Sequence, residues 1–410
     1  MKIAIAQINT TVGDIAGNVD KILLTAGQAK AKEVDLIIFP ELTITGYPAE
    51  DLLLKDSFIQ ANLGAVNDLA KDLHKLNLAA IVGFVDCNTG RGKPLFNAAA
   101  FIKDGQIIHR QYKSLLPSYD VFDEDRYFES AKNYQLIQLG KFKIGLTICE
   151  DAWAADSIEG SYFHGVESIK GRYFIDPIEE IVKLKPNLII NIAASPFAIS
   201  KYKVRENLLR QHALKWKQPI IFANQVGGND ELIFDGRSFV LNGNGEMVAI
   251  AASFEEDLLI FDIDESGKIT NSIKQEQDYK LEIYQAIVLG TRDYVRKCGF
   301  SDVVLGLSGG IDSAVTAAIA CQALGAEHVL GVCMPSPHSS SGSIDDSQRL
   351  AQNLGMKTIT IPIGETMQVF DNLLKDAFKG RKADITEENL QARLRAIILM
   401  ALSNKFNRLL

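Results

Sequence analysis

Cysteine is scarce in this sequence, and the spacing of its cysteines argues against two common structural roles. The 410 residues contain five cysteines, Cys87, Cys149, Cys298, Cys321 and Cys333, which are odd in number and widely separated. No C-x-x-C pair is present and the six histidines show no H-E-x-x-H spacing, so neither a disulfide framework nor a zinc site is predicted. A reducing, cytoplasmic location is therefore expected.

Long apolar runs and an excess of basic residues are also lacking. No apolar stretch reaches the length of a membrane span, and residues 1–8 alternate as a strand does, unlike the apolar core of a signal peptide. Lysine and arginine together number 43 against 51 acidic residues, which gives a formal net charge of -8. Neither a nucleic acid nor a membrane is therefore expected as a partner.

The composition that remains is that of a globular α/β protein. Hydrophobic residues make up 47% and charged residues 23% of the chain, whose length suggests two or three domains. Short runs rich in β-branched residues alternate with segments of helical periodicity, a pattern typical of layered α/β folds. Strands are predicted at residues 2–8, 35–40, 79–85, 144–149, 187–193 and 219–224, and helices at 19–32, 57–76 and 201–216.

The pattern changes twice in the second half of the chain. Residues 237–262 are rich in strand formers and contain an Asn-Gly-Asn-Gly turn. Residues 265–278 are polar and lack periodicity, which predicts a linker between a first domain, 1–264, and a second, 279–410. The second domain begins with an amphipathic helix and continues with alternating strands and helices, among them the strands HVLGVC and KTITIP.

Three segments of the first domain carry candidate catalytic residues. Glu41 lies in FPEL after an apolar strand, Lys113 lies in YKSLLPSYDVFDE, and Cys149 lies in ICED at the end of another strand. Taken singly, such residues are usually a loop carboxylate, a surface lysine and a core cysteine. As a set in this order, they resemble the Glu-Lys-Cys triad of the nitrilase (carbon–nitrogen hydrolase) superfamily over residues 1–264.

This resemblance implies an α-β-β-α sandwich that hydrolyses an amide through a thioester. A thiol attacks as thiolate, so a base and a nearby cation are expected to lower the pKa of Cys149. By the resemblance, Glu41 takes the thiol proton and later activates water. Lys113 and a backbone N–H after Cys149 would stabilise the oxyanion.

A narrower resemblance concerns the amide that is cleaved. The glutaminase domains of NAD synthetases place a tyrosine, a serine and a basic residue around glutamine, and Tyr119, Ser195 and Lys201 match those positions. Phe122 and Glu150 are expected as additional lining. Taken alone, Ser195 is an ordinary loop residue and Lys201 a surface charge at a helix start, so their assignment depends on the whole-chain pattern.

The segment LGLSGGIDSA of the second domain has the context of a phosphate-binding loop. It follows a strand and precedes a helix that runs from Asp312 to about Leu324, so backbone N–H groups and a helix N-terminus face the turn. It has no Walker A lysine; it resembles the S-G-G-x-D-S loop of the N-type ATP pyrophosphatases, which implies a Rossmann-like parallel-sheet domain. The resemblance implies ATP binding by Gly306, Leu307, Ser308, Gly309, Gly310, Ile311, Asp312 and Ser313, with Asp312 holding Mg²⁺.

Two further stretches resemble parts of NAD synthetases. MPSPHSSSGSIDDSQRLAQNLG is similar to the loop and helix that cover the nucleotide. ENLQARLRAIILMALSNKF is similar to the helix that contacts deamido-NAD across a dimer interface, with Asn389 and Arg393 at the contacting positions. The same stretch also has the pattern of an ordinary amphipathic helix. A homodimer or a higher homo-oligomer is expected from this resemblance.

Together the two halves resemble the glutamine-dependent NAD synthetases. The resemblance implies that glutamine is hydrolysed and that its ammonia is used for the ATP-dependent amidation of deamido-NAD to NAD. The family's T-G-N-K-S-E segment, with an ATP-contacting threonine and a metal-binding glutamate, does not occur in these 410 residues. The second domain is therefore expected to lack the family's C-terminal part, and NAD synthesis by these residues alone to be absent or reduced.

Three alternatives remain open at this stage. The first is a stand-alone nitrilase-type amidase or glutaminase with an incomplete, non-catalytic nucleotide-binding domain. A non-catalytic nucleotide-binding or assembly protein is a second reading, against which the presence of Glu41, Lys113 and Cys149 argues. A different amidotransferase with the same ATP loop is the third, and the nitrilase-like half argues against it.

Overall fold

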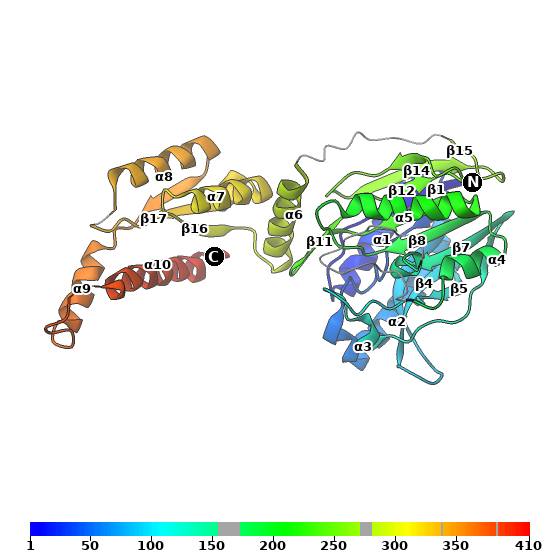
Figure 1. Ribbon diagram of the computed structural model, residues 1–410, viewed down its shortest axis with the longest axis horizontal. Helices are drawn as coiled ribbons and strands as arrows, with labels where there is room; N and C mark the ends of the chain where they lie inside the picture. Colours follow the sequence, from blue (N-terminus) through cyan, green and yellow to red (C-terminus); the bar gives the residue numbers. More distant parts are fainter. Residues whose placement is uncertain (155–172, 271–280, 338, 383) are drawn as a thin grey trace. The chain divides into compact units, whose positions relative to one another are not determined.

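The computed structural model describes residues 1–154, 173–270, 281–337, 339–382 and 384–410 (Figure 1). The chain forms two compact units, Met1–Ala286 and Ile287–Leu410. All five cysteines are free thiols. Among the described residues, no helix combines the length and the apolar content that a membrane span requires.

The first unit is built on two large sheets and one small hairpin. The first sheet has the order β15-β14-β1-β2-β3-β4-β5, and the second has the order β13-β12-β9-β8-β7-β6. The strands of the first sheet are β1 (Lys2–Gln7), β2 (Leu36–Ile38), β3 (Ala79–Cys87), β4 (Leu95–Lys103), β5 (Gln106–Tyr112), β14 (Asp257–Ile263) and β15 (Ile269–Thr270). Those of the second are β6 (Leu136–Leu139), β7 (Phe142–Ile148), β8 (Leu188–Ala193), β9 (Ile220–Asn224), β12 (Phe239–Leu241) and β13 (Met247–Ile250), and the hairpin pairs β10 (Val226–Asn229) with β11 (Leu232–Asp235).

Alternating side chains place the first sheet between two apolar cores. In β1, Ile3 and Ile5 join a core that includes Ile190 of the second sheet, whereas Ala4 and Ala6 join a separate core with helices. The strand is thus buried on both faces, which is why its sequence is almost continuously apolar. The helices of this unit are α1 (Ile15–Ala31), α2 (Asp56–Leu76), α3 (Glu124–Tyr127), α4 (Pro177–Lys183) and α5 (Lys201–Trp216), with short 3-10 turns η1 (Glu50–Leu54) and η2 (Cys149–Ala152).

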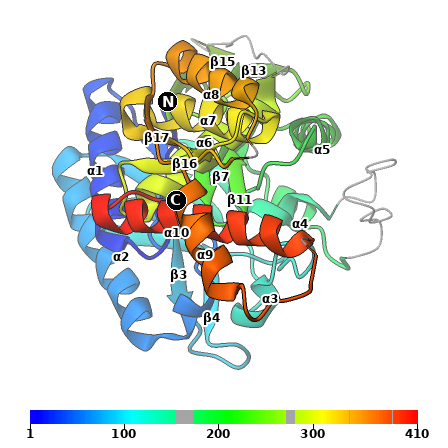
Figure 2. The same cartoon turned by 90° about the vertical axis from the view of Figure 1, so that its left-hand side faces the viewer.

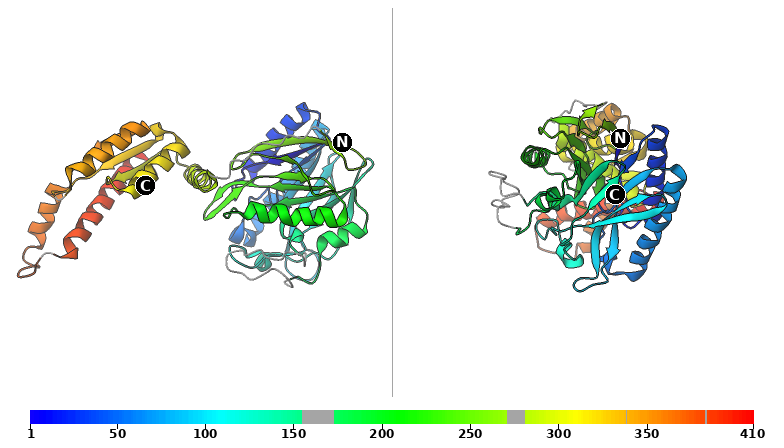
Figure 3. Two further views of the ribbon diagram at one scale, coloured as in Figure 1. Left: turned by 45° about the horizontal axis from the view of Figure 1, so that its top comes forward. Right: turned by 90° about the vertical axis from the view of Figure 1, so that its right-hand side faces the viewer.

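Helices cover the outer face of each sheet. Helices α1 and α2 contribute to the core behind the first sheet, and α4 and α5 contribute to the core that includes the second. In Figure 3 the blue helices α1 and α2 and the green helices α4 and α5 lie on opposite sides of the strands. The α-β-β-α sandwich expected from the sequence is confirmed.

The second unit has a three-stranded parallel sheet covered by helices on both faces. In Figure 2, α7 and α8 lie on one side of this sheet, and α9 and α10 lie on the other. Side chains of β16 alternate between two cores: Leu305 packs with α7 and α8, and Val304 packs with α9 and α10. This is the Rossmann-like arrangement predicted from the sequence. The strands are β16 (Val303–Leu307), β17 (Val329–Cys333) and β18 (Lys357–Thr360), and the helices are α6 (Glu282–Lys297), α7 (Ile311–Leu324), α8 (Ser341–Leu354), α9 (Gly364–Leu374) and α10 (Ile385–Phe406), with a 3-10 turn η4 at Ala326–His328.

The junction between the two units differs from the predicted linker, residues 265–278. Ile269 and Thr270 form β15, which pairs with Ile263 and Asp262 of β14, so the first sheet continues into the predicted linker. Residues 271–278 lie outside the described residues. The first turn of α6 belongs to the first unit, which ends at Ala286, because Glu282 at the start of this helix bonds to residues of the sandwich.

The turn that carries Glu41 packs closely against Gly83 of β3. A Cβ atom added to Gly83 would lie 2.3 Å from the backbone nitrogen of Leu42 and 2.5 Å from the carbonyl oxygen of Pro40. Both contacts are with buried backbone, so no flexible side chain is there to move away. A side chain at position 83 would therefore displace the turn after β2.

We predict that Gly83→Ala lowers the free energy of unfolding by about 1–3 kcal/mol, the usual cost of overpacking a buried site. Gly64→Ala is the matched control, because Gly64 is exposed on α2 and an added Cβ meets nothing within 4 Å. This control should gain up to about 1 kcal/mol from better helix propensity. Denaturant unfolding of both variants provides the measurement, and equal stabilities would contradict the assigned close approach.

Candidate active site

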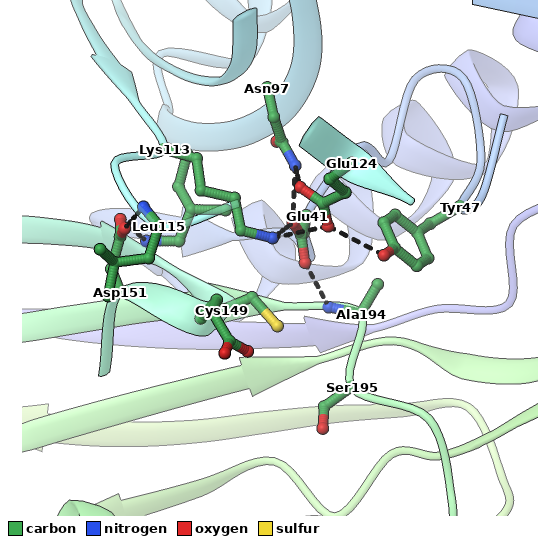
Figure 4. Close-up of polar contacts among 12 residues, drawn as sticks. Glu41, Tyr47, Asn97, Lys113, Leu115, Glu124, Cys149, Asp151, Ala194 and Ser195 are labelled. Carbon is green, nitrogen blue, oxygen red and sulfur yellow. Dashed lines mark hydrogen bonds and ion pairs between the residues drawn. The ribbon is translucent and has the colours of Figure 1, made fainter. Parts of the chain in front are cut away.

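Glu41, Lys113 and Cys149 all follow strands, and they come together at one edge of the sandwich. Glu41 lies three residues after β2, Lys113 directly follows β5, and Cys149 directly follows β7. The strands β2 and β5 run in the same direction in the first sheet, and β7 belongs to the second. Figure 4 shows the sulfur of Cys149 pointing into the space bordered by the Glu41 carboxylate and the backbone of Ala194.

A fully buried ion pair forms the centre of this site. The Lys113 ammonium donates to Oε1 of Glu41 at 2.7 Å, and both side chains have no exposed surface. The other carboxylate oxygen of Glu41 accepts the backbone N–H of Ala194 at 2.9 Å. Burial alone lowers the pKa of Lys113, but the carboxylates of Glu124 and Glu41 outweigh it and hold that pKa well above its usual value. Lys113 is therefore a permanent cation.

Glu124 is a second carboxylate on Lys113 that sequence reasoning did not single out. Its Oε1 accepts the Lys113 ammonium at 2.7 Å and the Tyr47 hydroxyl at 2.9 Å. The side-chain amide of Asn97 donates to Glu41 at 2.7 Å and to Glu124 at 3.1 Å, so it bridges both carboxylates. Burial raises the pKa of Glu124, and the charge of Lys113 opposes that rise. In the sequence, Glu124 stands in an acid-rich segment with nothing to distinguish it.

The turn that presents Cys149 is sharp and is fixed by Asp151. Cys149 has a φ of +45°, in the left-handed region that side chains other than glycine rarely adopt. The buried Asp151 carboxylate accepts the backbone N–H of Ile148 at 3.0 Å and those of Ser114 and Leu115 at 2.9 Å each. It thus ties the nucleophile turn to the segment that follows Lys113. Burial raises the pKa of Asp151 to about 7 against these three hydrogen bonds.

The protonation of Cys149 differs from the expectation that a nearby cation lowers its pKa. Burial and the carboxylate of Glu41 raise the pKa of the Cys149 thiol well above its usual value, although Lys113 acts in the opposite direction. The positive charge of Lys113 is already shared by two carboxylates, which is why it does not dominate. The raised pKa favours the neutral thiol of Cys149 over the thiolate.

Four of the five predicted glutamine-binding residues contact one another beside Cys149. The Tyr119 hydroxyl donates to the Glu150 carboxylate at 2.9 Å, and the Tyr119 and Phe122 rings lie 5.5 Å apart. The Lys201 ammonium lies 5.7 Å from the centre of the Phe122 ring. Burial, then the charge of Arg205, lowers the pKa of Lys201 to about 8.

Tyr173 is another residue that was not predicted from the sequence. Its hydroxyl donates to Oε1 of Glu150 at 2.7 Å, so two phenols hold this buried carboxylate. Ser195, the fifth predicted residue, is fixed through its backbone. Its N–H donates to the side-chain oxygen of Asn224 at 2.9 Å, and its carbonyl accepts the guanidinium of Arg205 at 3.2 Å.

The predicted phosphate loop has the geometry of an open turn before a helix. Gly309 has a φ of +79°, and an added Cβ would lie 2.4 Å from the carbonyl oxygen of Ser343, so only glycine fits. The Ser313 hydroxyl donates to the carbonyl of Gly310 at 3.0 Å, and the Ser308 hydroxyl accepts the N–H of Gly310 at 3.2 Å. Helix α7 begins at the next residue, directing its N-terminus at the turn.

A cavity of about 330 Å³ adjoins this loop. The residues that line it are Gly306, Leu307, Ser308, Cys333, Met334, Pro335, Ser339, Ser343, Ile344, Ser347, Arg395 and Leu399. It includes residues of the stretch predicted to cover the nucleotide, which contains the whole of α8. His338 of that stretch lies outside the described residues. Asp312, Asn389 and Arg393 are exposed, on α7 and α10, and Arg393 donates to the carbonyl of Asn389 at 3.1 Å.

Comparison with known proteins defines the class first. Residues 2–269 match the family model of the carbon–nitrogen hydrolases, and residues 283–410 match that of the NAD synthases. The chain thus joins an amide-hydrolysing unit of the nitrilase type to an NAD synthase unit.

Relatives that share both units define the family. The chain is 44% identical to the glutamine-dependent NAD(+) synthetase of Synechocystis over 100% of this chain and 73% of the relative, and 37% identical to that of Thermotoga maritima over 99% and 73%. A solved structure from Acinetobacter baumannii, a glutamine-dependent NAD+ synthetase in complex with ADP, matches with 38% identity and a TM-score of 0.88, over 99% of this chain and 73% of that one. The chain belongs to the glutamine-dependent NAD(+) synthetases.

We predict that Asp151→Asn destabilises the nucleophile turn. The amide presents an NH₂ group where a carboxylate oxygen accepted N–H donors, so at least one buried donor loses its partner at a cost of about 1–3 kcal/mol. Denaturant unfolding and the rate of Cys149 alkylation both report the change. Asp120→Asn is the control, because Asp120 is exposed in the segment that follows Lys113 and its φ of +55° also suits asparagine. Unchanged stability and alkylation in Asp151→Asn would show that the turn does not depend on this carboxylate.

Proposed function

We propose that the first unit releases ammonia from glutamine at Cys149 and that the second uses this ammonia and ATP to convert deamido-NAD to NAD. The observation that carries this assignment is the buried Glu41–Lys113 pair beside Cys149, in the same chain as the glycine-rich loop before α7. Full-chain relatives that carry both units favour it over a stand-alone amidase with a non-catalytic second domain.

The first step is attack of the Cys149 sulfur on the side-chain amide carbon of glutamine. Glu41 takes the thiol proton as the S–C bond forms, because the raised pKa of the thiol disfavours a free thiolate in the resting site. The oxyanion that develops is stabilised by the Lys113 ammonium and by a backbone N–H of the turn after Cys149. Glu41 then gives its proton to the departing nitrogen, and ammonia leaves a thioester.

The second step hydrolyses this thioester. Glu41 removes a proton from water as the water oxygen attacks the thioester carbon, and Lys113 again faces the oxyanion. Collapse of the tetrahedral intermediate breaks the S–C bond, returns the proton to sulfur and releases glutamate. The hydrogen bond from Ala194 to the second oxygen of Glu41 keeps the carboxylate in one orientation through both steps.

Two buried groups of opposite charge, Glu150 and Lys201, suit the two charged ends of glutamine. We assign the Glu150 carboxylate, held by two phenols, to the α-ammonium group. Lys201 is assigned to the α-carboxylate, with Tyr119, Phe122 and Ser195 as lining. Each assignment places a charged substrate group against a buried opposite charge, which rejects amides that lack that group.

In the second unit, residues 306–313 are assigned to ATP. Backbone N–H groups of the open turn and the N-terminus of α7 suit phosphate oxygens. The exposed carboxylate of Asp312, near the Ser308 and Ser313 hydroxyls in sequence, offers the oxygen ligands that Mg²⁺ prefers, so Asp312 is assigned to this ion. A magnesium ion would supply charge neutralisation of the phosphates.

The reaction at this second site has two steps. The nicotinate carboxylate of deamido-NAD attacks the α-phosphorus of ATP and displaces pyrophosphate. Ammonia then attacks the acyl-adenylate carbon, and AMP leaves as NAD forms. Asn389 and Arg393 are assigned to deamido-NAD.

The proposal also includes the oligomeric state and the cellular compartment of the protein. Exposed apolar side chains on α9 and α10, among them Val369, Leu373, Ile397 and Met400, favour association of copies into a homodimer or a higher homo-oligomer. A reducing, cytoplasmic compartment suits a mechanism that needs Cys149 as a free thiol.

Two variants test whether glutamine hydrolysis and NAD formation occur at separate sites, and each variant serves as the control for the other. Cys149→Ala should lower ammonia release from glutamine by at least about a thousandfold, because no other group forms the thioester. NAD formation from deamido-NAD, ATP and ammonium should persist. Asp312→Asn should impair ammonium-driven NAD formation and leave the Cys149 chemistry intact. Ammonia release that survives in Cys149→Ala would disprove the proposed nucleophile.

The pH dependence of glutamine binding tests the role of Lys201. Its pKa of about 8 lies below the usual lysine value, so its charge is present below pH 8 and is lost as the pH rises. The KM for glutamine should therefore rise above pH 8, by up to about tenfold per pH unit. Lys201→Arg keeps its charge, so the rise in KM that comes from loss of the Lys201 charge should be absent in this variant. Titration of glutamine itself affects the wild-type protein and the variant equally. Identical profiles would contradict the assignment.

A further inference from the structure

Glu282, the first residue of α6, reaches into the sandwich although it stands at the start of the synthetase segment. Its side chain is almost fully buried, 7% exposed as a whole residue. One carboxylate oxygen accepts the backbone N–H of Ser200 at 3.4 Å, and the other lies 3.3 Å from the guanidinium of Arg237. A buried carboxylate with two such contacts is fixed in place, and the mechanism above gives it no role.

The first contact acts on the beginning of α5. Ser200 has a φ of +65°, an unusual conformation for serine, and it immediately precedes Lys201. The Ser200 side chain makes no cap hydrogen bond at this helix start, so the contact with Glu282 helps to hold a turn that is otherwise unfavourable. The position of Lys201 depends on that turn.

The second contact begins a row of buried charges that ends at Ser195. Arg237 lies 3.9 Å from the carboxylate of Asp235, and Asp235 forms a close ion pair with Arg205. The guanidinium of Arg205 donates to the carbonyl of Ser195 at 3.2 Å. All four charged side chains of this row are buried.

Charge balance makes Glu282 necessary to this row. Two guanidinium groups share the single carboxylate of Asp235, and Glu282 supplies the second negative charge. Without Glu282, Arg237 would be a buried cation whose positive charge is not fully balanced, and it would compete with Arg205 for Asp235. A weaker hold of Asp235 on Arg205 would release the carbonyl of Ser195.

We propose that Glu282 is a positioning residue for the glutamine subsite, acting on Lys201 through Ser200 and on Ser195 through Arg237, Asp235 and Arg205. This inference rests on the proposed assignment of Lys201 and Ser195 to glutamine. Helix α6 carries Glu282 in the first unit and contributes Val288 and Val295 to the core of the second. Glu282 therefore acts within the first unit, to which it belongs.

The test compares two reagents that alkylate Cys149 in the intact chain. A glutamine-shaped diazoketone, 6-diazo-5-oxo-L-norleucine, needs the glutamine subsite, whereas iodoacetamide needs only the thiol. Glu282→Gln keeps an oxygen for Ser200 but removes the charge that faces Arg237. We expect it to slow diazoketone labelling by about tenfold, the scale of coupling through such networks, with iodoacetamide labelling changed less than about twofold. Glu282→Ala should show a larger selective loss.

The control is Glu265→Gln, which removes an exposed carboxylate of the same unit that pairs with Lys141 at 2.8 Å. Both reagents should label it at the wild-type rate. If Glu282→Ala is unfolded at the assay temperature, the test relies on Glu282→Gln and on Arg237→Lys, which conserves the charge. Arg237→Lys should lose less diazoketone labelling than Glu282→Gln does.

Two results would overturn the inference: unchanged diazoketone labelling in folded Glu282 variants, or equal slowing of both reagents, which would mean that Glu282 acts on the thiol itself. Failure of the underlying assignment looks different, because the wild-type protein would then show no preference for the diazoketone over iodoacetamide. In that case Glu282 could not be positioning a glutamine subsite, and the inference would fall with the assignment.

Discussion

The amidase site depends on one buried interaction, the Lys113 ammonium held between the carboxylates of Glu41 and Glu124. Removing three charged groups from water is unfavourable unless each finds good partners. Tyr47 donates to the same oxygen of Glu124 as Lys113 does, and Asn97 donates to the other oxygen of Glu124. The N–H of Ala194 donates to the second oxygen of Glu41. Loss of any one partner leaves a buried charge with a missing hydrogen bond, so the site is rigid.

The same polar contacts tie the two sheets together. Ala194 follows β8 of the second sheet and donates to Glu41, which follows β2 of the first. Asp151, in the turn after β7, accepts backbone N–H groups of Ser114 and Leu115, which come shortly after β5. The apolar core joins the sheets over their interior, and these contacts join them at the edge where the strands end. Catalytic geometry and sheet packing therefore support each other.

The sequence predicted those parts of the structure that have a strong local signal. Helix α5 has the predicted bounds because its apolar residues recur at helical spacing. Strand β4 was not predicted, since its alanines have low strand propensity, nor was β5, an edge strand with several polar residues. Glu124 and Asp151 were missed as site residues because their roles arise from contacts between distant segments. Resemblance selected Glu41, Lys113 and Cys149 as candidates, but it did not predict the protonation of the thiol, which depends on burial.

The neutral state of the Cys149 thiol explains why Glu41 and Lys113 must lie in contact. A thiolate added to a buried site that already holds two carboxylates would increase its negative charge, and the raised pKa of Cys149 expresses this cost. In the proposed mechanism, transfer of the proton to Glu41 during attack neutralises one carboxylate as the oxyanion forms. The total charge of the site then stays constant, and Lys113 exchanges one anionic partner, Glu41, for another, the oxyanion. Because this exchange requires a bound amide to accept the negative charge, the thiol remains neutral and weakly reactive until substrate is in place.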